Sequence, residues 1–132
     1  MWPAKIELLF SQHGYSIAKY CEWQPGRGII DPMILVYVTY KNKKEAEKIV
    51  GILLKERLIA GANVFPVKSA YWWKGKIEKA SEYVSILKTA PKNWMKIQTA
   101  VKRIHSYETP FIAKISAHGT DEIEEWVKSE SR

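Results

Sequence analysis

The sequence predicts a single α+β domain in which helices pack on one antiparallel sheet. The chain has 132 residues, which is close to the usual size of one domain. Runs of branched and aromatic residues alternate along it with segments in which apolar residues recur every three or four positions, the spacings of strands and helices. A two-residue turn at Lys74-Gly75 joins two long extended runs, which indicates a β-hairpin.

The first two elements are a strand and a helix. Residues 34–40 are branched and aromatic without alternation, which is typical of a strand covered on both faces. Asn42 can cap the next segment, and Glu45 stands three residues later, as in a capping box. The apolar positions that follow recur at helical spacing and are Ala46, Ile49, Val50, Leu53, Leu54 and Leu58. A helix is therefore expected between Asn42 and Gly61.

The hairpin comprises residues 62–73 and 76–89. At about 3.3 Å per residue, arms of this length extend about 40 Å. A compact domain of about 100 residues has a diameter of only about 34 Å. The hairpin is therefore predicted to project beyond its own domain.

The end of the hairpin carries Tyr71, Trp72 and Trp73. Exposing such large apolar groups to water is unfavourable. We expect a second copy of the chain to cover them, with hairpin edges pairing between subunits in a closed ring. The alternative is that Pro66 marks a bulge that bends the arm back over its own sheet.

The remaining elements are a helix, a strand and a short helix. Pro91 suits the first turn of a helix whose apolar face is formed by Trp94, Ile97, Val101 and Ile104. Residues 111–117 form the fourth predicted strand, and Asp121 with Glu124 predicts a capping box for the last helix. Ferredoxin-like domains share this βαββαβ order and place both helices on one face of the sheet. The prediction is a ferredoxin-like sandwich with a long β-hairpin and a C-terminal helix.

Residues 1–32 differ from the rest of the chain. They show no sustained period, carry equal numbers of acidic and basic residues, and end at Asp31-Pro32, which disfavours helix. We expect this segment to be an N-terminal extension that the fold does not need. Residues 33–132 are the predicted domain, and the working protein is expected to begin at Met33.

Composition and motifs disfavour several functions. No apolar run approaches the roughly 20 residues of a membrane-spanning helix. The single cysteine, Cys21, can form neither an intrachain disulfide nor a cysteine-based zinc site, which favours the cytoplasm. The net charge of +7 suits an anionic partner, yet the segment after Lys74-Gly75 departs from the RNA-recognition signature. Glu78 and Glu82 share a strand face without a nucleophile motif, so we predict no enzymatic activity.

Four segments together resemble the CutA family of divalent-cation tolerance proteins. They are residues 53–63 (LLKERLIAGAN), 71–78 (YWWKGKIE), 86–89 (ILKT) and 105–110 (HSYETP). The resemblance extends from Met33 to the C-terminus. It implies a ferredoxin-like subunit in a tight homotrimer, associated with copper and other divalent cations and without an established enzymatic activity.

The resemblance also implies site residues. His105, Tyr107 and Pro110 match one family motif, and Lys88 matches the lysine of the family's Leu-Lys-Thr strand. In the family these residues lie near a cleft between subunits. Lys88 and Tyr107 are therefore the predicted cleft residues.

Two positions depart from the family pattern, since Gly61 replaces a cysteine and Ser106 a proline of many members. Without that cysteine a copper site lacks its soft ligand. We expect weak Cu(II) binding at His105, joined by Glu108, and no required cofactor.

The residues alone leave alternatives open. His105 also suits a structural role at a helix end, where the helix dipole stabilises its positive form. Lys88 either binds an anionic ligand or extends its stem over the sheet edge. The rival function is a trimeric sensor that binds an anionic metabolite between subunits at Lys88 and Tyr107, and a nucleic-acid-binding module ranks behind it.

Overall fold

The computed structural model describes residues 31–132, and the predictions for residues 1–30 lie outside this part of the chain. Its elements are β1 (Met33–Tyr40), α3 (Lys43–Lys55), β2 (Gly61–Trp73), β3 (Lys76–Thr89), the 3₁₀ turn η1 (Pro91–Asn93), α4 (Trp94–Ile104), β4 (Ile112–Ala117) and α5 (Asp121–Glu130). This order confirms the predicted sequence of strands and helices. None of the described helices is both long enough and apolar enough to span a membrane.

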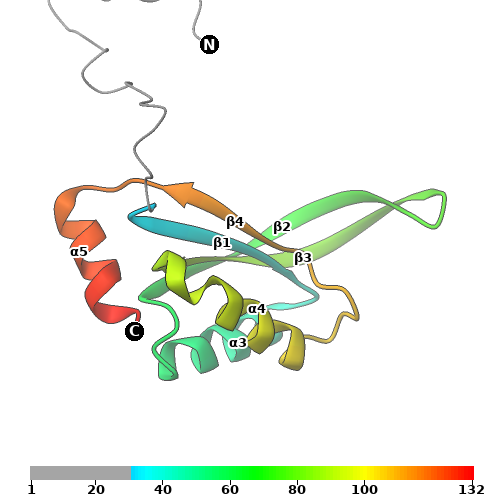
Figure 1. Ribbon diagram of the computed structural model, residues 1–132. Coiled ribbons are helices and arrows are strands. Elements are labelled where there is room, and N and C mark those ends of the chain that lie inside the picture. Colours follow the sequence, from blue (N-terminus) through cyan, green and yellow to red (C-terminus); the bar gives the residue numbers. More distant parts are fainter. Residues whose placement is uncertain (1–30) are drawn as a thin grey trace, which may run out of the picture.

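The four strands form one antiparallel sheet in the order β2-β3-β1-β4. Helices α3 and α4 lie side by side on one face of the sheet, and α5 lies at one end (Figure 1). This is the predicted ferredoxin-like arrangement with an added C-terminal helix.

The core lies between the sheet and the two helices. Strand β1 contributes Ile34, Val36, Val38 and Tyr40, which alternate with half-buried residues. The prediction that β1 is covered on both faces is wrong within one chain, because α3 and α4 cover the same face. The opposite face therefore carries apolar side chains that one chain does not fully bury.

Helix α3 begins as the sequence predicts. The Asn42 side chain accepts a hydrogen bond of 2.9 Å from the backbone N–H of Glu45. The helix ends at Lys55 because Arg57 adopts a φ of 60° and the N–H of Leu58 turns back to bond the carbonyl of Leu53. Leu58, which the sequence placed in the helical pattern, is buried just beyond the helix.

Helix α5 begins one residue earlier than predicted. Thr120, not Asp121, is the N-cap residue, and its hydroxyl accepts a hydrogen bond from the N–H of Ile123. Glu124 does return to the helix start, where it accepts from the N–H of Gly119. Threonine and aspartate are both favoured caps, so the sequence pattern fits two adjacent starts equally well.

The hairpin is regular along its whole length. Its register runs without interruption from Gly61 opposite Lys88 to Trp73 opposite Lys76. The alternative of a bulge at Pro66 is wrong, because this residue pairs directly with Tyr83. The hairpin projects well past the helices (Figure 1), and the side chains of Trp72 and Trp73 are 73% and 57% exposed. The length prediction is thus confirmed.

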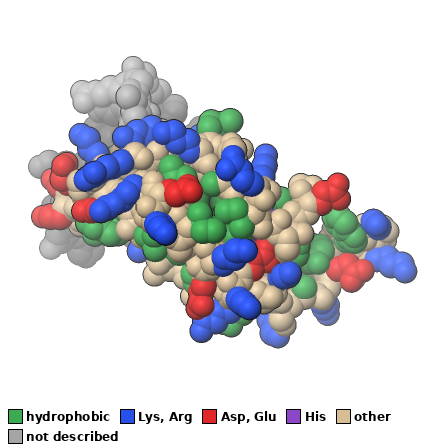
Figure 2. All heavy atoms as spheres, turned by 90° about the horizontal axis from the view of Figure 1, so that it is seen from below, with side chains coloured by type: hydrophobic (Ala, Val, Ile, Leu, Met, Phe, Trp, Pro, Cys, Tyr) green, Lys and Arg blue, Asp and Glu red, His purple; other side chains and the backbone are tan. Residues whose placement is uncertain are grey.

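The two helices on the sheet, together with the residues that flank them, carry the chain's excess of positive charge. Residues 41–57 and 91–104 contain ten Lys or Arg residues and three Glu residues. Their excess of seven equals the formal net charge of +7 for the whole chain. Figure 2 views the molecule from the helix side and shows basic side chains spread across it.

Candidate functional site

The predicted site residue His105 begins the loop that joins α4 to β4. It is the C-cap of α4, and its N–H donates to the carbonyl of Val101 at 2.8 Å. Its side chain is 0% exposed, and the imidazole stacks on the ring of Tyr40 with 5.4 Å between centroids. Burial raises the pKa of Tyr40 to about 12, and its hydroxyl lies 2.7 Å from Ser85 Oγ. The imidazole thus lies against a neutral buried phenol.

Both ring nitrogens of His105 have hydrogen-bond partners. Nε2 lies 2.7 Å from the carbonyl oxygen of Thr39, which can only accept, so Nε2 is the donor. Nδ1 accepts from the backbone N–H of Tyr107 at 3.0 Å. The geometry selects the neutral tautomer protonated at Nε2, with its one lone pair engaged.

Glu45 connects the first turn of α3 to the same loop. Its Oε1 accepts from the N–H of Ser106 at 2.7 Å, and its Oε2 accepts from the Ser106 hydroxyl at 2.8 Å. Oε1 also lies 3.4 Å from Nδ1 of His105. Burial raises the pKa of the Glu45 carboxyl, but the two Ser106 hydrogen bonds and the nearby positive charge of Lys41 outweigh it, so the pKa is lowered overall.

Ser106 explains one departure from the family pattern. A proline at this position would have no backbone N–H and could not make the 2.7 Å bond to Glu45. The serine therefore provides two hydrogen bonds to a carboxylate that proline cannot make. Sequence reasoning recognised Glu45 only as part of a helix cap.

Tyr107 attaches the loop to the middle of β3. Its phenol donates to Oε2 of the buried Glu82 at 2.7 Å. Burial, followed by this hydrogen bond, raises the pKa of Tyr107. Sequence reasoning paired Glu82 with Glu78 and missed its true partner, since no local pattern links residues 25 positions apart. We call His105, Ser106, Tyr107, Glu45 and Glu82 the His105 cluster.

Two other predicted residues, Lys88 and Glu108, lie outside the His105 cluster. Lys88 is half-buried and pairs with Gly61 across the hairpin. It is six residues from Glu82 along β3, or about 20 Å at about 3.3 Å per residue. One chain therefore does not bring Lys88 to Tyr107. Glu108 is exposed on the loop.

The His105 cluster does not fit a divalent cation as it stands. Within residues 31–132 no group of three or more His, Cys, Asp or Glu side chains is arranged to hold a metal ion. The lone pair of His105 that would bind copper accepts a hydrogen bond from Tyr107 instead. In this conformation the histidine holds the loop against β1.

Gly61, the second departure from the family pattern, faces Trp126 of α5. A Cβ atom added to Gly61 would lie 3.0 Å from Cη2 of that indole. Such a distance is shorter than ordinary van der Waals contact, so a cysteine side chain would displace the ring. Any side chain at this position would therefore compete with Trp126 for space.

Comparisons with known proteins agree with this fold. Residues 34–130 match the family model for CutA1 divalent ion tolerance protein. A divalent-cation tolerance protein CutA from Archaeoglobus fulgidus is 41% identical over 93 residues, covering 70% of this chain and 91% of the relative. A protein of the same name from Pyrococcus horikoshii is 43% identical over 90 residues, covering 68% and 88%. Protein CutA 1, chloroplastic, from Oryza sativa is 33% identical over 103 residues, covering 76% and 58%.

Comparison with solved structures also finds CutA proteins. The structure of the periplasmic divalent cation tolerance protein CutA from Archaeoglobus fulgidus has a TM-score of 0.74 and 38% identity, covering 76% of this chain and 99% of that one. The structure of CutA1 from Pyrococcus horikoshii has a TM-score of 0.72 and 38% identity, covering 75% and 98%. The fold is thus shared and the matches cover most of the chain, so the chain belongs to the CutA1 family of divalent ion tolerance proteins.

Proposed function

We propose that this protein is a non-enzymatic divalent-cation tolerance protein that works as a homotrimer. The observation that carries the proposal is the incompletely buried face of the sheet, opposite α3 and α4. Because side chains alternate along a strand and Leu87 is in the core, its neighbours Ile86 and Lys88 belong to this other face. On β1 and β2 it includes Tyr37 and Phe65, which are half-buried.

The sheet edges support assembly as well. Strands β2 and β4 are the two edges, and each exposes apolar side chains, with Ile115 on β4 and Trp72 and Trp73 at the end of β2. Unpaired edges with apolar residues favour pairing with another chain, and a closed ring leaves none open. The number of three subunits rests on the resemblance to the CutA family.

Native mass spectrometry of the full chain tests the assembly. We expect one species with the mass of three chains, and a monomer at micromolar concentration would refute the homotrimer. Tolerance itself is tested in a bacterial strain that lacks its own CutA-type gene. Expression of this chain should raise the copper concentration that permits growth, and unchanged tolerance would refute that part of the proposal.

Cation contact is proposed to be weak and to involve His105 together with Glu108. Binding at Nδ1 requires release of the Tyr107 N–H, and no thiolate is available at Gly61. Imidazole and carboxylate ligands suit Cu(II) better than Cu(I). In calorimetric titration with Cu(II), His105→Ala should abolish binding, and His118→Ala serves as control because His118 is exposed in another loop. Equal binding by wild type and His105→Ala would remove His105 from the site.

A second candidate function is binding of an anionic metabolite between subunits. It is favoured by Lys88, which is half-buried on the sheet face proposed to meet another subunit and has no carboxylate within 4.0 Å in the described part of the chain. Tyr107 of another subunit would complete the site. Titration with ATP and with inorganic phosphate tests it, and Lys88→Gln should weaken binding about ten-fold. If neither ATP nor inorganic phosphate bound, the anionic-metabolite function would be refuted and divalent-cation tolerance would remain the proposed function.

We also propose that residues 33–132 are the working domain and that it acts in the cytoplasm. The single cysteine supports a reducing compartment, although relatives carry chloroplastic and periplasmic names. A chain beginning at Met33 loses the bond between Ser116 Oγ and Asp31, which is exposed and costs little. It should melt within a few degrees of the full chain. A larger loss would show that residues 1–32 stabilise the domain.

A further inference from the structure

A groove of about 390 Å³ lies on the helix side, between the end of α3 and α4. Leu58 and Ala100 contribute apolar surface to it, and Lys96, Arg103 and Met95 of α4 also line it. None of its lining residues belongs to the His105 cluster. It also lies on the opposite side of the sheet from the face proposed for assembly.

The cations of the groove are spaced and unpaired. Lys96 and Arg103 are separated by about two helical turns, or about 10 Å at about 1.5 Å per residue. No carboxylate lies within 4.0 Å of either side chain in the described part of the chain. Both charges are therefore available to an acidic partner.

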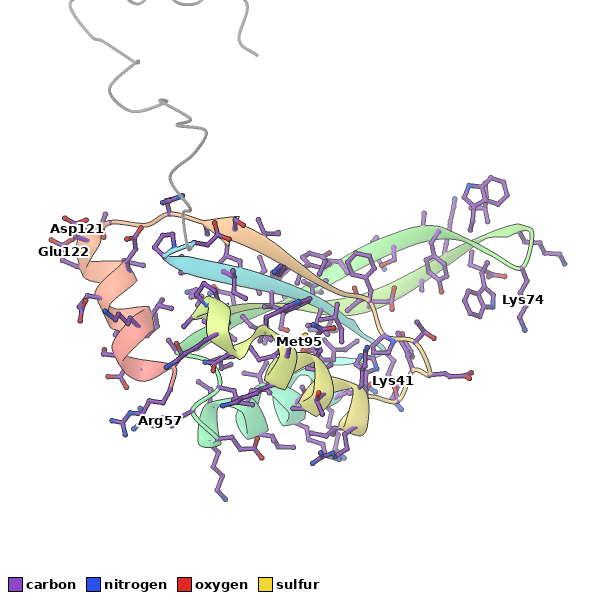
Figure 3. The ribbon with its side chains drawn as sticks, viewed as in Figure 1. Lys41, Arg57, Lys74, Met95, Asp121 and Glu122 are labelled. Carbon is purple, nitrogen blue, oxygen red and sulfur yellow. The ribbon has the colours of Figure 1, made fainter. Side chains whose placement is uncertain are left out.

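The groove also offers apolar contact. Met95 is 67% exposed, and Figure 3 labels it on α4. Methionine is flexible and polarisable, so it adapts to the shape of an apolar partner. The remaining lining residues are Thr99 and Glu56, so the groove carries two cationic side chains and one carboxylate and is positive overall.

We propose that this groove binds an acidic helical segment of another protein. In such a segment an apolar side chain lies between two carboxylates seven residues apart, so that the carboxylates reach Lys96 and Arg103 while the apolar group contacts Leu58, Ala100 and Met95. The excess charge of the helix side attracts an acidic partner. The lining is aliphatic and offers no aromatic ring on which a base could stack, which favours a peptide over a single-stranded nucleic acid.

Fluorescence anisotropy with the full chain tests this proposal. The probe is a labelled helical peptide of about 16 residues with Glu at two positions seven apart and Leu between them. Lys96→Gln and Arg103→Gln should each weaken binding about ten-fold, because each removes a charge-assisted contact. Lys44→Gln and Lys48→Gln make the same charge change at exposed positions of α3 and should weaken binding less than two-fold.

Three outcomes would overturn the proposal. Equal weakening by Lys48→Gln and Lys96→Gln would indicate attraction by the whole basic surface. Unchanged affinity of a peptide in which Ser replaces the Leu would exclude the apolar contact. Tighter binding of a single-stranded RNA oligonucleotide or of phosphatidylserine vesicles, through the same two residues, would assign the groove to a different class of partner.

Discussion

The phenol of Tyr107 donates a 2.7 Å hydrogen bond to Oε2 of Glu82, which joins the loop after α4 to the middle of β3. The backbone N–H of the same tyrosine donates to His105 Nδ1. One residue therefore orients both the histidine and a buried carboxylate. His105 and Tyr107, which both match the family motif, thus together hold this loop against β1 and β3.

Tyr107→Phe should destabilise the protein by about 1–3 kcal/mol, because it leaves the buried Glu82 carboxylate without its donor. Urea unfolding followed by circular dichroism measures the change, at one fixed protein concentration because the proposed assembly would add to stability. Tyr83→Phe is the matched control, since its hydroxyl has no described hydrogen bond. Equal stability of Tyr107→Phe and wild type would contradict the conclusion that the Tyr107 hydroxyl holds the loop against β3.

Glu45→Gln should lower stability at neutral pH by about 1.5 kcal/mol, the usual contribution of hydrogen bonds to a charged group. The pKa of Glu45 is lower in the folded protein than its ordinary value of 4.5. Its contribution is therefore complete above pH 4.5 and is lost as the pH falls through the folded pKa. The difference between wild type and Glu45→Gln should shrink in the same range.

Thermal melts between neutral pH and pH 3 check this prediction. Glu47→Gln provides the control, because Glu47 is exposed and forms only a surface ion pair with Lys43. A stability difference for Glu45→Gln that is constant across the range would show that its charge is not involved.

Gly61→Cys should cost about 1 kcal/mol, because the new Cβ would lie 3.0 Å from Trp126 Cη2 and the indole must tilt away. Trp126→Leu removes the opposing ring. In a double-mutant cycle measured by urea unfolding, the pair should therefore cost less than the sum of the single changes. Strict additivity would show that the two side chains do not compete for this space.

Replacing Trp72 and Trp73 together by serine should weaken subunit association by about 2 kcal/mol or more for each ring that an interface buries. Sedimentation at several concentrations measures the dissociation constant. Lys76→Ser, at the same end of the hairpin, controls for a change of surface composition. An unchanged dissociation constant for the double variant would place the interface elsewhere.

The elements were predictable because each depends on local periodicity. Asn42 with Glu45 correctly marked the start of α3, and the Lys74-Gly75 turn, with φ values of 49° and 79°, joins the hairpin as its sequence indicated. Errors of one residue arose where two adjacent residues are equally good caps, as at Thr120 and Asp121. Pro66 does not form the bulge that was considered as an alternative, because proline is tolerated in an edge strand such as β2.

By itself the sequence determined the strands, the helices, their order and the family resemblance, since side-chain spacing and short motifs lie within a few residues of each other. Only the tertiary structure decided which groups His105 contacts. Its partners come from Thr39 at the end of β1 and Tyr107 in the loop, with Glu45 of α3 beside it. A hydrogen bond depends on the positions of atoms in space, and folding brings together residues up to 66 positions apart whose proximity no local pattern encodes.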